Sequence, residues 1–199
     1  MNSGKFIVFY GINRLGKTTQ SEVVSREIEI RNSVDILRIK YPRYDLEPTG
    51  PRINDYLRKE NLEGLTSLEH QKLQLQNKID YQPTLMEKLE SGLWVLAEDY
   101  VLTGIAWGIA SGVDELWLKE ESEKLLKENL GVLFDGEPFA YREEGHLYEN
   151  DDIDITKRCR EIHLRLAQEF NVPIINTNQL KEQVTQDILK ILTERGFII

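Results

Sequence analysis

The chain has 199 residues, enough for one domain of ordinary size with a real hydrophobic core. Its net charge of -9 argues against binding to nucleic acid or anionic membranes, and its single cysteine, Cys159, excludes an internal disulfide and a cysteine-based metal site. No run of about 18 apolar residues predicts a membrane span, and no signal peptide precedes the first predicted strand, so we expect a cytoplasmic protein.

The first predicted strand leads into a glycine-rich loop. Phe6–Tyr10 is apolar and rich in residues that favour strands, and Gly11–Thr18 fits the phosphate-binding pattern G-x-x-x-x-G-K-[ST]. Val24 and Ile28 then recur at helical spacing, which predicts a helix over Thr19–Ile28. A strand, a glycine loop and a helix in this order are the context that a P-loop requires. We therefore predict a site for the phosphates of a nucleoside triphosphate.

Several residues of this loop have a specific role in phosphate chemistry. Gly11 and Gly16 permit positive φ and close approach of the backbone, so that main-chain N–H groups can surround phosphate oxygens. Lys17 would reach the β- and γ-phosphates, and the Thr18 hydroxyl would bind Mg²⁺. Arg14 either contacts the phosphoryl group in transfer or is a solvated surface residue. The predicted nucleotide-binding set is Gly11, Asn13, Leu15, Gly16, Lys17, Thr18 and Thr19.

The remaining predicted elements alternate between short apolar strands and longer segments of helical period. That alternation predicts an α/β fold of three layers, with a five-stranded parallel sheet between helices on both faces, as in P-loop NTPases. The other strands are Val34–Lys40, Trp94–Ala97, Gly131–Phe134 and Val172–Ile175. The other helices are Ser67–Ser91, which Pro83 would kink or divide, Val101–Ser111, Val113–Asn129, Asp152–Phe170 and Gln179–Arg195, which Gly196 would cap. We place no domain boundary.

Two long polar connections, Tyr41–Pro51 and Glu137–Asp151, are candidates for segments that close over a ligand, the second as a short lid. Ligands of open α/β sheets bind beyond the carboxyl ends of the strands, so the residues that follow each strand are candidates for the site.

The polar residues after four strands suggest different roles. Arg43 could bind an acceptor phosphate, or simply occupy a turn. Glu98 or Asp99 could hold Mg²⁺ or orient an attacking oxygen, although Asp99 could equally cap the next helix. Asp135 is either a further Mg²⁺ ligand or part of a turn. Asn176–Gln179 could contact a purine base.

Two further patterns are set aside. Asn77–Asp80 matches N-K-x-D, a guanine-reading motif, but the segment before it is too polar for a central parallel strand, so we interpret the match as coincidence. The histidines His70, His146 and His163 lack the spacing of metal ligands, and we interpret them as structural or exposed.

Several separated segments resemble one family, the thymidylate kinases, in the same order along the chain. These P-loop kinases pass the γ-phosphate of ATP to thymidine monophosphate. The similar segments are Phe9–Gln20, which includes the loop arginine of one branch, Tyr41–Arg43, Gly50–Leu57, Asn77–Lys78, Tyr100–Trp107 and Gly145–Asn150. The resemblance covers nearly the whole chain. It implies that ATP is the phosphoryl donor, that Mg²⁺ is the metal cofactor, and that the protein forms a homodimer through the helices 67–91 and 101–111.

The resemblance is weaker on the acceptor side. Where the family usually has an acid that meets the acceptor sugar, an arginine that reads the base and an aromatic that stacks on it, this chain has Asn13, Lys78 and Gln74. The family's Asp-Arg pair after the third strand appears as Glu98–Asp99, and a lid arginine aligns with Leu147. The donor half therefore resembles the family more closely than the acceptor half does.

The preferred interpretation is a kinase that phosphorylates a small nucleotide, most simply thymidine monophosphate, and that binds neither nucleic acid nor a membrane. Lys17, Arg14 and Glu98 would be catalytic, and Thr18 and Glu98 would hold Mg²⁺. The acceptor would be bound by Arg43, Gln74, Lys78, Asp99 and Tyr100. Two alternatives stay open: a kinase of a nucleoside, with Glu98 as the base, and a nucleotide-binding regulator without transferase activity.

Overall fold

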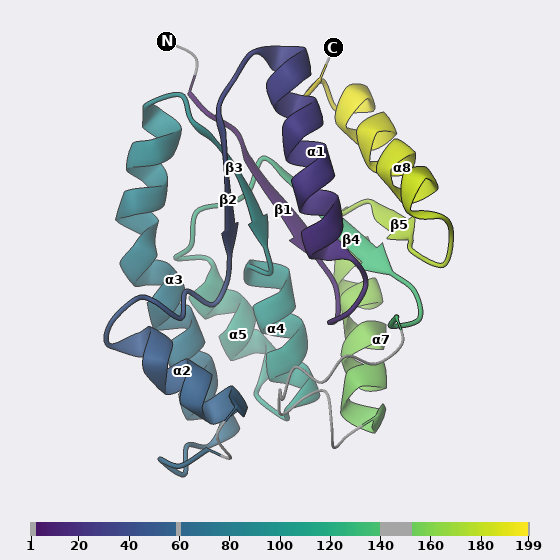
Figure 1. The fold of residues 1–199 in the computed structure, drawn as a ribbon. Helices are drawn as coiled ribbons and strands as arrows, with labels where there is room; N and C mark the ends of the chain where they lie inside the picture. Colours follow the sequence, from purple (N-terminus) through teal and green to yellow (C-terminus); the bar gives the residue numbers. More distant parts are fainter. Residues whose placement is uncertain (1–2, 59–60, 140–152, 199) are drawn as a thin grey trace.

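The computed structural model describes residues 3–58, 61–139 and 153–198, and its centre is one parallel sheet (Figure 1). The strands lie in the order β2-β3-β1-β4-β5, and every neighbouring pair is parallel. Their bounds are β1 Phe6–Tyr10, β2 Ile36–Lys40, β3 Trp94–Glu98, β4 Leu130–Asp135 and β5 Ile174–Asn176. The predicted five-stranded parallel sheet is confirmed.

Helices cover both faces of this sheet, which confirms the three-layer prediction. On one face, α1 (Lys17–Asn32) packs against α8 (Lys181–Glu194) and against the central strands (Figure 1). On the other lie α3 (Ser67–Glu90), α4 (Val101–Ala110) and α7 (Ile153–Glu169). Two shorter helices complete this layer: α2 (Thr49–Arg58) packs on α3, and α5 (Glu115–Ser122) packs on α4.

The central strands are buried on both faces, and their register positions the site. All five residues of β1 and all five of β3 are buried, as expected for apolar strands between two helical layers. In the parallel register Phe9 is opposite Glu98. The glycine loop that follows β1 and the acidic residues that end β3 therefore leave the sheet side by side at its carboxyl edge.

Two predicted helices differ from the structure. Ser67–Ser91 was expected to kink or divide at Pro83, but α3 runs without interruption through this exposed proline. Its first turn is fixed by a capping box between Thr66 and Glu69, and its length packs on β3 and α4. This tertiary contact outweighs the loss of one helical hydrogen bond.

The predicted helix Val113–Asn129 is only eight residues long, because α5 begins after the Asp114 cap and ends at Ser122. Long-range pairing explains the early end. Asn129 exchanges hydrogen bonds with Phe6, through its own backbone N–H and its side-chain oxygen, so the chain is drawn into extended structure next to β1. The helical period of the sequence does not reveal this partner.

The connections after β2 and β4 also differ in part from expectation. The segment predicted as a loop over Tyr41–Pro51 becomes helical at Thr49, where α2 begins. Of the predicted lid Glu137–Asp151, residues 137–139 are described. Residues 140–151, which include His146, Leu147 and the similar segment 145–150, lie outside the described residues.

At the end of α8, Gly196 has a φ of 72°, as the predicted cap requires. Among the helices described, none has the length and apolar character to cross a bilayer.

Candidate active site

The loop between β1 and α1 has the backbone geometry that a phosphate cradle needs. Gly11, Arg14 and Gly16 have positive φ values of 130°, 63° and 82°. A Cβ on Gly11 would lie 2.5 Å from the carbonyl oxygen of Phe134, so only glycine fits there. Gly16 caps α1 without a side-chain hydrogen bond, which leaves the amides of the first turn for an anion.

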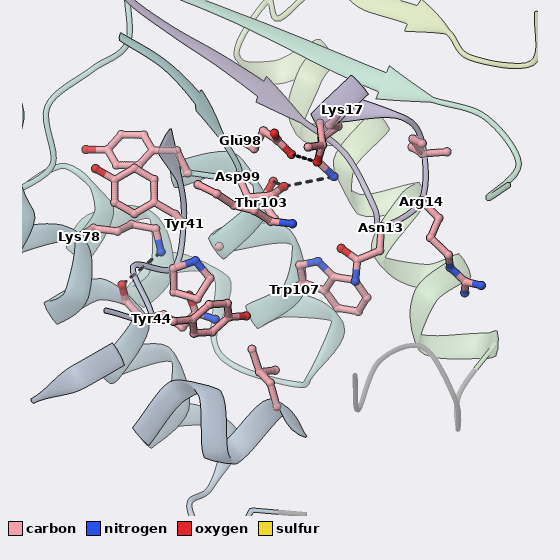
Figure 2. A pocket seen from close by; sticks show the side chains of 18 of the residues that line it. Asn13, Arg14, Lys17, Tyr41, Tyr44, Lys78, Glu98, Asp99, Thr103 and Trp107 are labelled. Atoms are coloured by element: carbon pink, nitrogen blue, oxygen red, sulfur yellow. Dashed lines mark hydrogen bonds and ion pairs between the residues drawn. The ribbon is translucent and has the colours of Figure 1, made fainter. Parts of the chain in front are cut away.

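Lys17 is folded back onto this loop. Its Nζ donates to the carbonyl oxygens of Gly11 and Ile12 at 2.7 and 2.8 Å, and it lies 3.4 Å from Asp99 Oδ1 (Figure 2). The side chain is 6% exposed, so its charge is held in place by these oxygens rather than by water. A phosphate bound on the loop would offer the same ammonium group stronger, charged acceptors.

Thr18 and Glu98, the two residues predicted to hold Mg²⁺, lie together at the start of α1. The Thr18 hydroxyl donates to Glu98 Oε2 at 2.7 Å, and the Ser21 hydroxyl donates to Oε1 at 3.0 Å. Hydroxyl and carboxylate oxygens are hard ligands that fit Mg²⁺ together with substrate phosphates and water. In the described part of the chain no group of three or more acidic, histidine or cysteine ligands exists, so a metal here would need substrate oxygens.

A cleft of about 630 Å³ extends from the glycine loop across the carboxyl edge of the sheet (Figure 2). At one end lies the loop, including Asn13, Arg14 and Thr18. The walls and the far end come from the segment after β2 and from α2, α3 and α4. These parts contribute Lys40, Tyr41, Pro42, Tyr44, Leu57, Arg58, His70, Gln71, Gln74, Lys78, Thr103, Gly104 and Trp107. One cavity thus joins the predicted donor and acceptor sides.

The α3 wall of this cleft carries two of the predicted acceptor residues, Gln74 and Lys78. Lys78 Nζ donates to the Gln74 carbonyl oxygen at 3.2 Å, and burial lowers the pKa of Lys78 to about 8, although Asp99 favours its charged form. Gln74 Nε2 lies 3.4 Å from His70 Nε2, and the His70 ring stacks on Tyr56 at 3.8 Å. This wall is therefore polar, and its cation is partly desolvated.

Asp99 and Tyr100 end β3 in an unusual backbone conformation. Asp99 has φ 59, and Tyr100, not Asp99, occupies the cap position of α4, so the helix-capping alternative is wrong. Asp99 Oδ1 instead accepts a hydrogen bond from the Thr103 hydroxyl at 3.2 Å. The Tyr100 ring packs between Phe6 and Tyr41, with centroid distances of 5.1 and 5.0 Å, and burial raises the pKa of Tyr100.

Thr103 connects Asp99 to a buried histidine of α7. His163 Nε2 lies 3.4 Å from the Thr103 hydroxyl, and His163 Nδ1 lies 2.9 Å from the Cys159 carbonyl oxygen. Burial lowers the pKa of His163 to about 4, so the ring is neutral near pH 7. A proton on Nδ1 satisfies the carbonyl and leaves Nε2 unprotonated, so the single hydroxyl proton of Thr103 is given either to Asp99 Oδ1 or to His163 Nε2. The His163 side chain thus has a structural role, as expected.

Arg43 does not line the cleft, although the sequence suggested that it binds the acceptor. Its Nη2 lies 2.8 Å from Asp45 Oδ2, and its guanidinium stands 4.8 Å from the centre of the Tyr81 ring. The cause lies in the backbone, because the buried Asn77 side chain accepts from the Arg43 N–H at 2.7 Å and donates to its carbonyl oxygen at 2.9 Å. Asn77 lies inside α3 and not after a strand, so the N-K-x-D match is a coincidence.

Two other predicted positions also lie away from the cleft. Asp135 accepts from Arg160 Nε at 2.6 Å, so its carboxylate is paired with α7. The segment Asn176–Gln179 packs on the chain after β4, where Asn178 Oδ1 accepts from the Glu137 N–H at 2.8 Å. Neither lines the cavity.

The cleft also contains residues that the sequence did not suggest. Tyr44, Arg58, His70 and Trp107 all line it, and the Arg58 guanidinium lies 5.7 Å from the centre of the Tyr44 ring. Burial raises the pKa of Tyr44, while the positive charges of Arg58 and Lys40 oppose that shift. No motif marks Tyr44, Arg58 or His70, whereas Trp107 ends the segment Tyr100–Trp107 that resembles the family. Tyr44 and Trp107 lie on segments that follow a strand, but Arg58 and His70 enter the cleft from α2 and α3 and carry no such signal.

Comparisons with known proteins point to one family. The family model for thymidylate kinase matches residues 9–188. Thymidylate kinase of Plasmodium falciparum is 25% identical over 198 residues, which cover 96% of this chain and 90% of that protein. A probable thymidylate kinase of Methanocaldococcus jannaschii is 27% identical over 95% of this chain and 96% of its own length. The solved thymidylate kinase of Candida albicans shares the fold with a TM-score of 0.82 at 19% identity, covering 98% of this chain and 93% of that one.

Proposed function

The chain belongs to the thymidylate kinase family and is a nucleotide kinase; from this premise we propose that it transfers the γ-phosphoryl group of ATP to thymidine monophosphate. The observation that carries the proposal is the continuous cleft that joins the glycine loop to the polar wall of α3. A donor on the loop and an acceptor against α3 would meet near Lys17 and Asp99, whose Nζ and Oδ1 atoms lie 3.4 Å apart.

On the donor side, the amides of the glycine loop and of the first turn of α1 would bind the phosphates of ATP. Lys17 would exchange the carbonyl oxygens of Gly11 and Ile12 for the β- and γ-phosphates. Arg14, on the same loop, would stabilise charge on the phosphoryl group in transfer. Asn13, Leu15, Gly16 and Thr19 would complete the nucleotide contacts.

Thr18 and Glu98 would hold Mg²⁺, because their oxygens already lie 2.7 Å apart beside the loop. When bound, this ion would neutralise phosphate charge and fix the geometry of the triphosphate. The protein's own contribution is to keep both ligands in place, which Ser21 assists by donating to the second oxygen of Glu98.

On the acceptor side, Tyr44, Arg58 and Lys40 would meet the phosphate of thymidine monophosphate in place of Arg43. All three residues line the same cleft, and the Arg58 guanidinium lies 5.7 Å from the centre of the Tyr44 ring. The thymine base would lie toward Gln74 and Lys78, whose buried ammonium can donate to a base carbonyl. Tyr100 also lines the cleft, and its ring, packed between Phe6 and Tyr41, would form part of the acceptor wall.

Three finer features are also part of the proposal. The segment from Glu137 to Asp151 would act as a lid that excludes water from the transfer. The protein would reside in the cytoplasm, and it would form a homodimer through α3 and α4, as the family resemblance implies. Size-exclusion chromatography with light scattering tests the last feature, since a mass of one 23.2 kDa chain would contradict it.

The function is tested by an acceptor screen with purified protein, ATP and Mg²⁺, in which ADP release is followed for each nucleoside monophosphate. Thymidine monophosphate should give the highest kcat/KM, and mass spectrometry should identify thymidine diphosphate as the product. Two other monophosphates serve as comparisons. Deoxycytidine monophosphate has the same sugar and differs in the base, which would face the α3 wall. Uridine monophosphate lacks the thymine methyl group and carries ribose in place of deoxyribose.

The same screen separates this proposal from a regulatory role. A regulator would bind ATP in calorimetry, with no acceptor accelerating ADP release. Preference for another monophosphate would keep the reaction class and reject thymidine monophosphate as the acceptor.

A further inference from the structure

Asp99 brings a carboxylate to the point of the cleft where phosphoryl transfer would take place. Its Oδ1 is 3.4 Å from Lys17 Nζ, the group proposed to hold the γ-phosphate (Figure 2). The side chain is 13% exposed and lines the cavity. Oδ1 also accepts the Thr103 hydrogen bond, while Oδ2 has no hydrogen bond or ion pair with any residue that the structure describes.

This carboxylate favours a neutral acceptor oxygen over an anionic one. A phosphate that approaches the γ-phosphorus beside Lys17 meets a like charge on Asp99, and like charges at such short range repel. Arg43 is turned toward Asp45 and Tyr81, so Arg58 and Lys40 are the cations that would have to offset this repulsion for a monophosphate acceptor. An uncharged hydroxyl carries no such penalty, and it can donate its hydrogen bond to Asp99.

Asp99, rather than Glu98, has the geometry of a base. Both oxygens of Glu98 accept hydrogen bonds from hydroxyls of α1, and the residue is only 6% exposed. Asp99 keeps one oxygen without a described partner and faces the cavity, and its backbone is fixed at φ 59 by the turn between β3 and α4. A hydroxyl bound next to it would lie within reach of both the base and the phosphoryl group held by Lys17.

We propose that this cleft also phosphorylates the free 5′-hydroxyl of a deoxynucleoside, with Asp99 as the general base. The inference rests on the proposed ATP site. The 5′-oxygen attacks the γ-phosphorus and forms a new P–O bond, while the bond from that phosphorus to the bridging oxygen breaks and ADP leaves. The hydroxyl proton passes to Asp99, which returns it to solvent after the product departs. The products are ADP and a deoxynucleoside 5′-monophosphate, which the proposed main reaction can use as its acceptor.

The test supplies purified protein with ATP, Mg²⁺ and thymidine, and measures thymidine mono- and diphosphate together by chromatography and mass spectrometry. Wild-type protein should form both in a thymidine-dependent way. In Asp99→Asn, kcat with thymidine should fall by about 10²- to 10⁴-fold, the usual contribution of a general base. The loss of kcat with thymidine should exceed any loss of kcat with thymidine monophosphate in the same variant by at least tenfold, because only the neutral hydroxyl needs a base.

Asparagine suits this test because it is, with aspartate, among the non-glycine residues that most readily adopt the left-handed backbone of Asp99, so the variant should fold. Asp45→Asn is the matched control, since Asp45 is exposed and lies outside the cleft, and it should leave both reactions unchanged within twofold.

No product from thymidine, with thymidine monophosphate still phosphorylated, overturns the inference and leaves the proposed function standing. Equal losses with both acceptors in Asp99→Asn also overturn it, since Asp99 would then serve the donor side. If wild-type protein phosphorylates neither acceptor, the proposed function fails as well.

Discussion

The two halves of the cleft are built in different ways. The donor half consists of the consecutive residues Gly11–Thr18 with Glu98 beside them, and its key groups are main-chain amides and one lysine. The acceptor half is assembled from side chains of the segment after β2 and of α2, α3 and α4, which are far apart in the sequence. A site made of consecutive backbone is specified locally, whereas a site made of converging side chains depends on how every contributing element packs.

This contrast predicts different consequences of substitution. Changes in the donor half should reduce turnover with every acceptor, because all reactions share ATP. Changes in the acceptor half should alter KM and the choice of acceptor while ATP binding persists. The predictions that follow test this division, from the largest expected effect to the smallest.

Removal of the loop lysine should have the largest effect. Lys17→Ala should lower kcat by about 10²- to 10³-fold with every acceptor, because one preorganised cation that faces the transferring charge is lost. Steady-state kinetics with thymidine monophosphate measures the loss. Lys72→Ala, an exposed change on α3, should keep wild-type rates. A Lys17→Ala protein with more than a tenth of wild-type kcat would remove Lys17 from the mechanism.

The backbone of the same loop can be tested by adding one methyl group. Gly11→Ala should lower the free energy of unfolding by about 3 kcal/mol and abolish measurable ATP binding, because its Cβ would collide with the Phe134 carbonyl and φ 130 is unfavourable. Gly64→Ala is the control, since φ is 64 there but nothing lies within 4 Å, and it should cost about 1 kcal/mol. Chemical denaturation and calorimetry measure both. If Gly11→Ala and Gly64→Ala lower the free energy of unfolding by similar amounts, neighbouring backbone must move to make room for the new Cβ at position 11.

The buried cation of the acceptor half should make stability depend on pH. Lys78 has a folded-state pKa of about 8, below its ordinary 10.5, so between these values the unfolded chain binds the extra proton. Raising the pH through this window should therefore stabilise the wild-type protein relative to Lys78→Met by up to about 3 kcal/mol. Denaturation curves at several pH values from 7 to 10 test this. For the control Lys72→Met, at an exposed position, the difference in free energy of unfolding from wild type should stay constant over this range. If the difference in free energy of unfolding between wild type and Lys78→Met does not change with pH, the pKa of Lys78 is not lowered in the folded protein.

Substitution of Arg58 and of Arg43 should have different effects on the KM for thymidine monophosphate. Arg58→Ala should raise KM for thymidine monophosphate about tenfold, as expected for the loss of one charged hydrogen bond to phosphate. Arg43→Ala should change it less than twofold, because Arg43 is turned toward Tyr81 and Asp45. KM for ATP should stay constant in both variants. The reverse order of effects would mean that the loop after β2 rearranges when the acceptor binds.

Much of the fold followed from sequence pattern, and the misses have specific causes. The strands were predictable because buried parallel strands read as continuous apolar runs, as in Phe6–Tyr10 and Trp94–Ala97. The helix predicted over Val113–Asn129 was too long because Asn129 pairs with Phe6, a partner far away in the chain. Strand and helix periods report local geometry, so they carry no information about such pairings.

The sequence by itself determined the phosphate loop, because glycine spacing, one lysine and one threonine fix that structure within eight residues. Only the tertiary structure decided which charges face the acceptor. Asn77, on α3, bonds both backbone groups of Arg43 and so turns its guanidinium out of the cleft, while the packing of α2 on α3 brings Arg58 in. The direction of a long side chain depends on contacts between distant elements, and no local pattern of residues encodes those contacts.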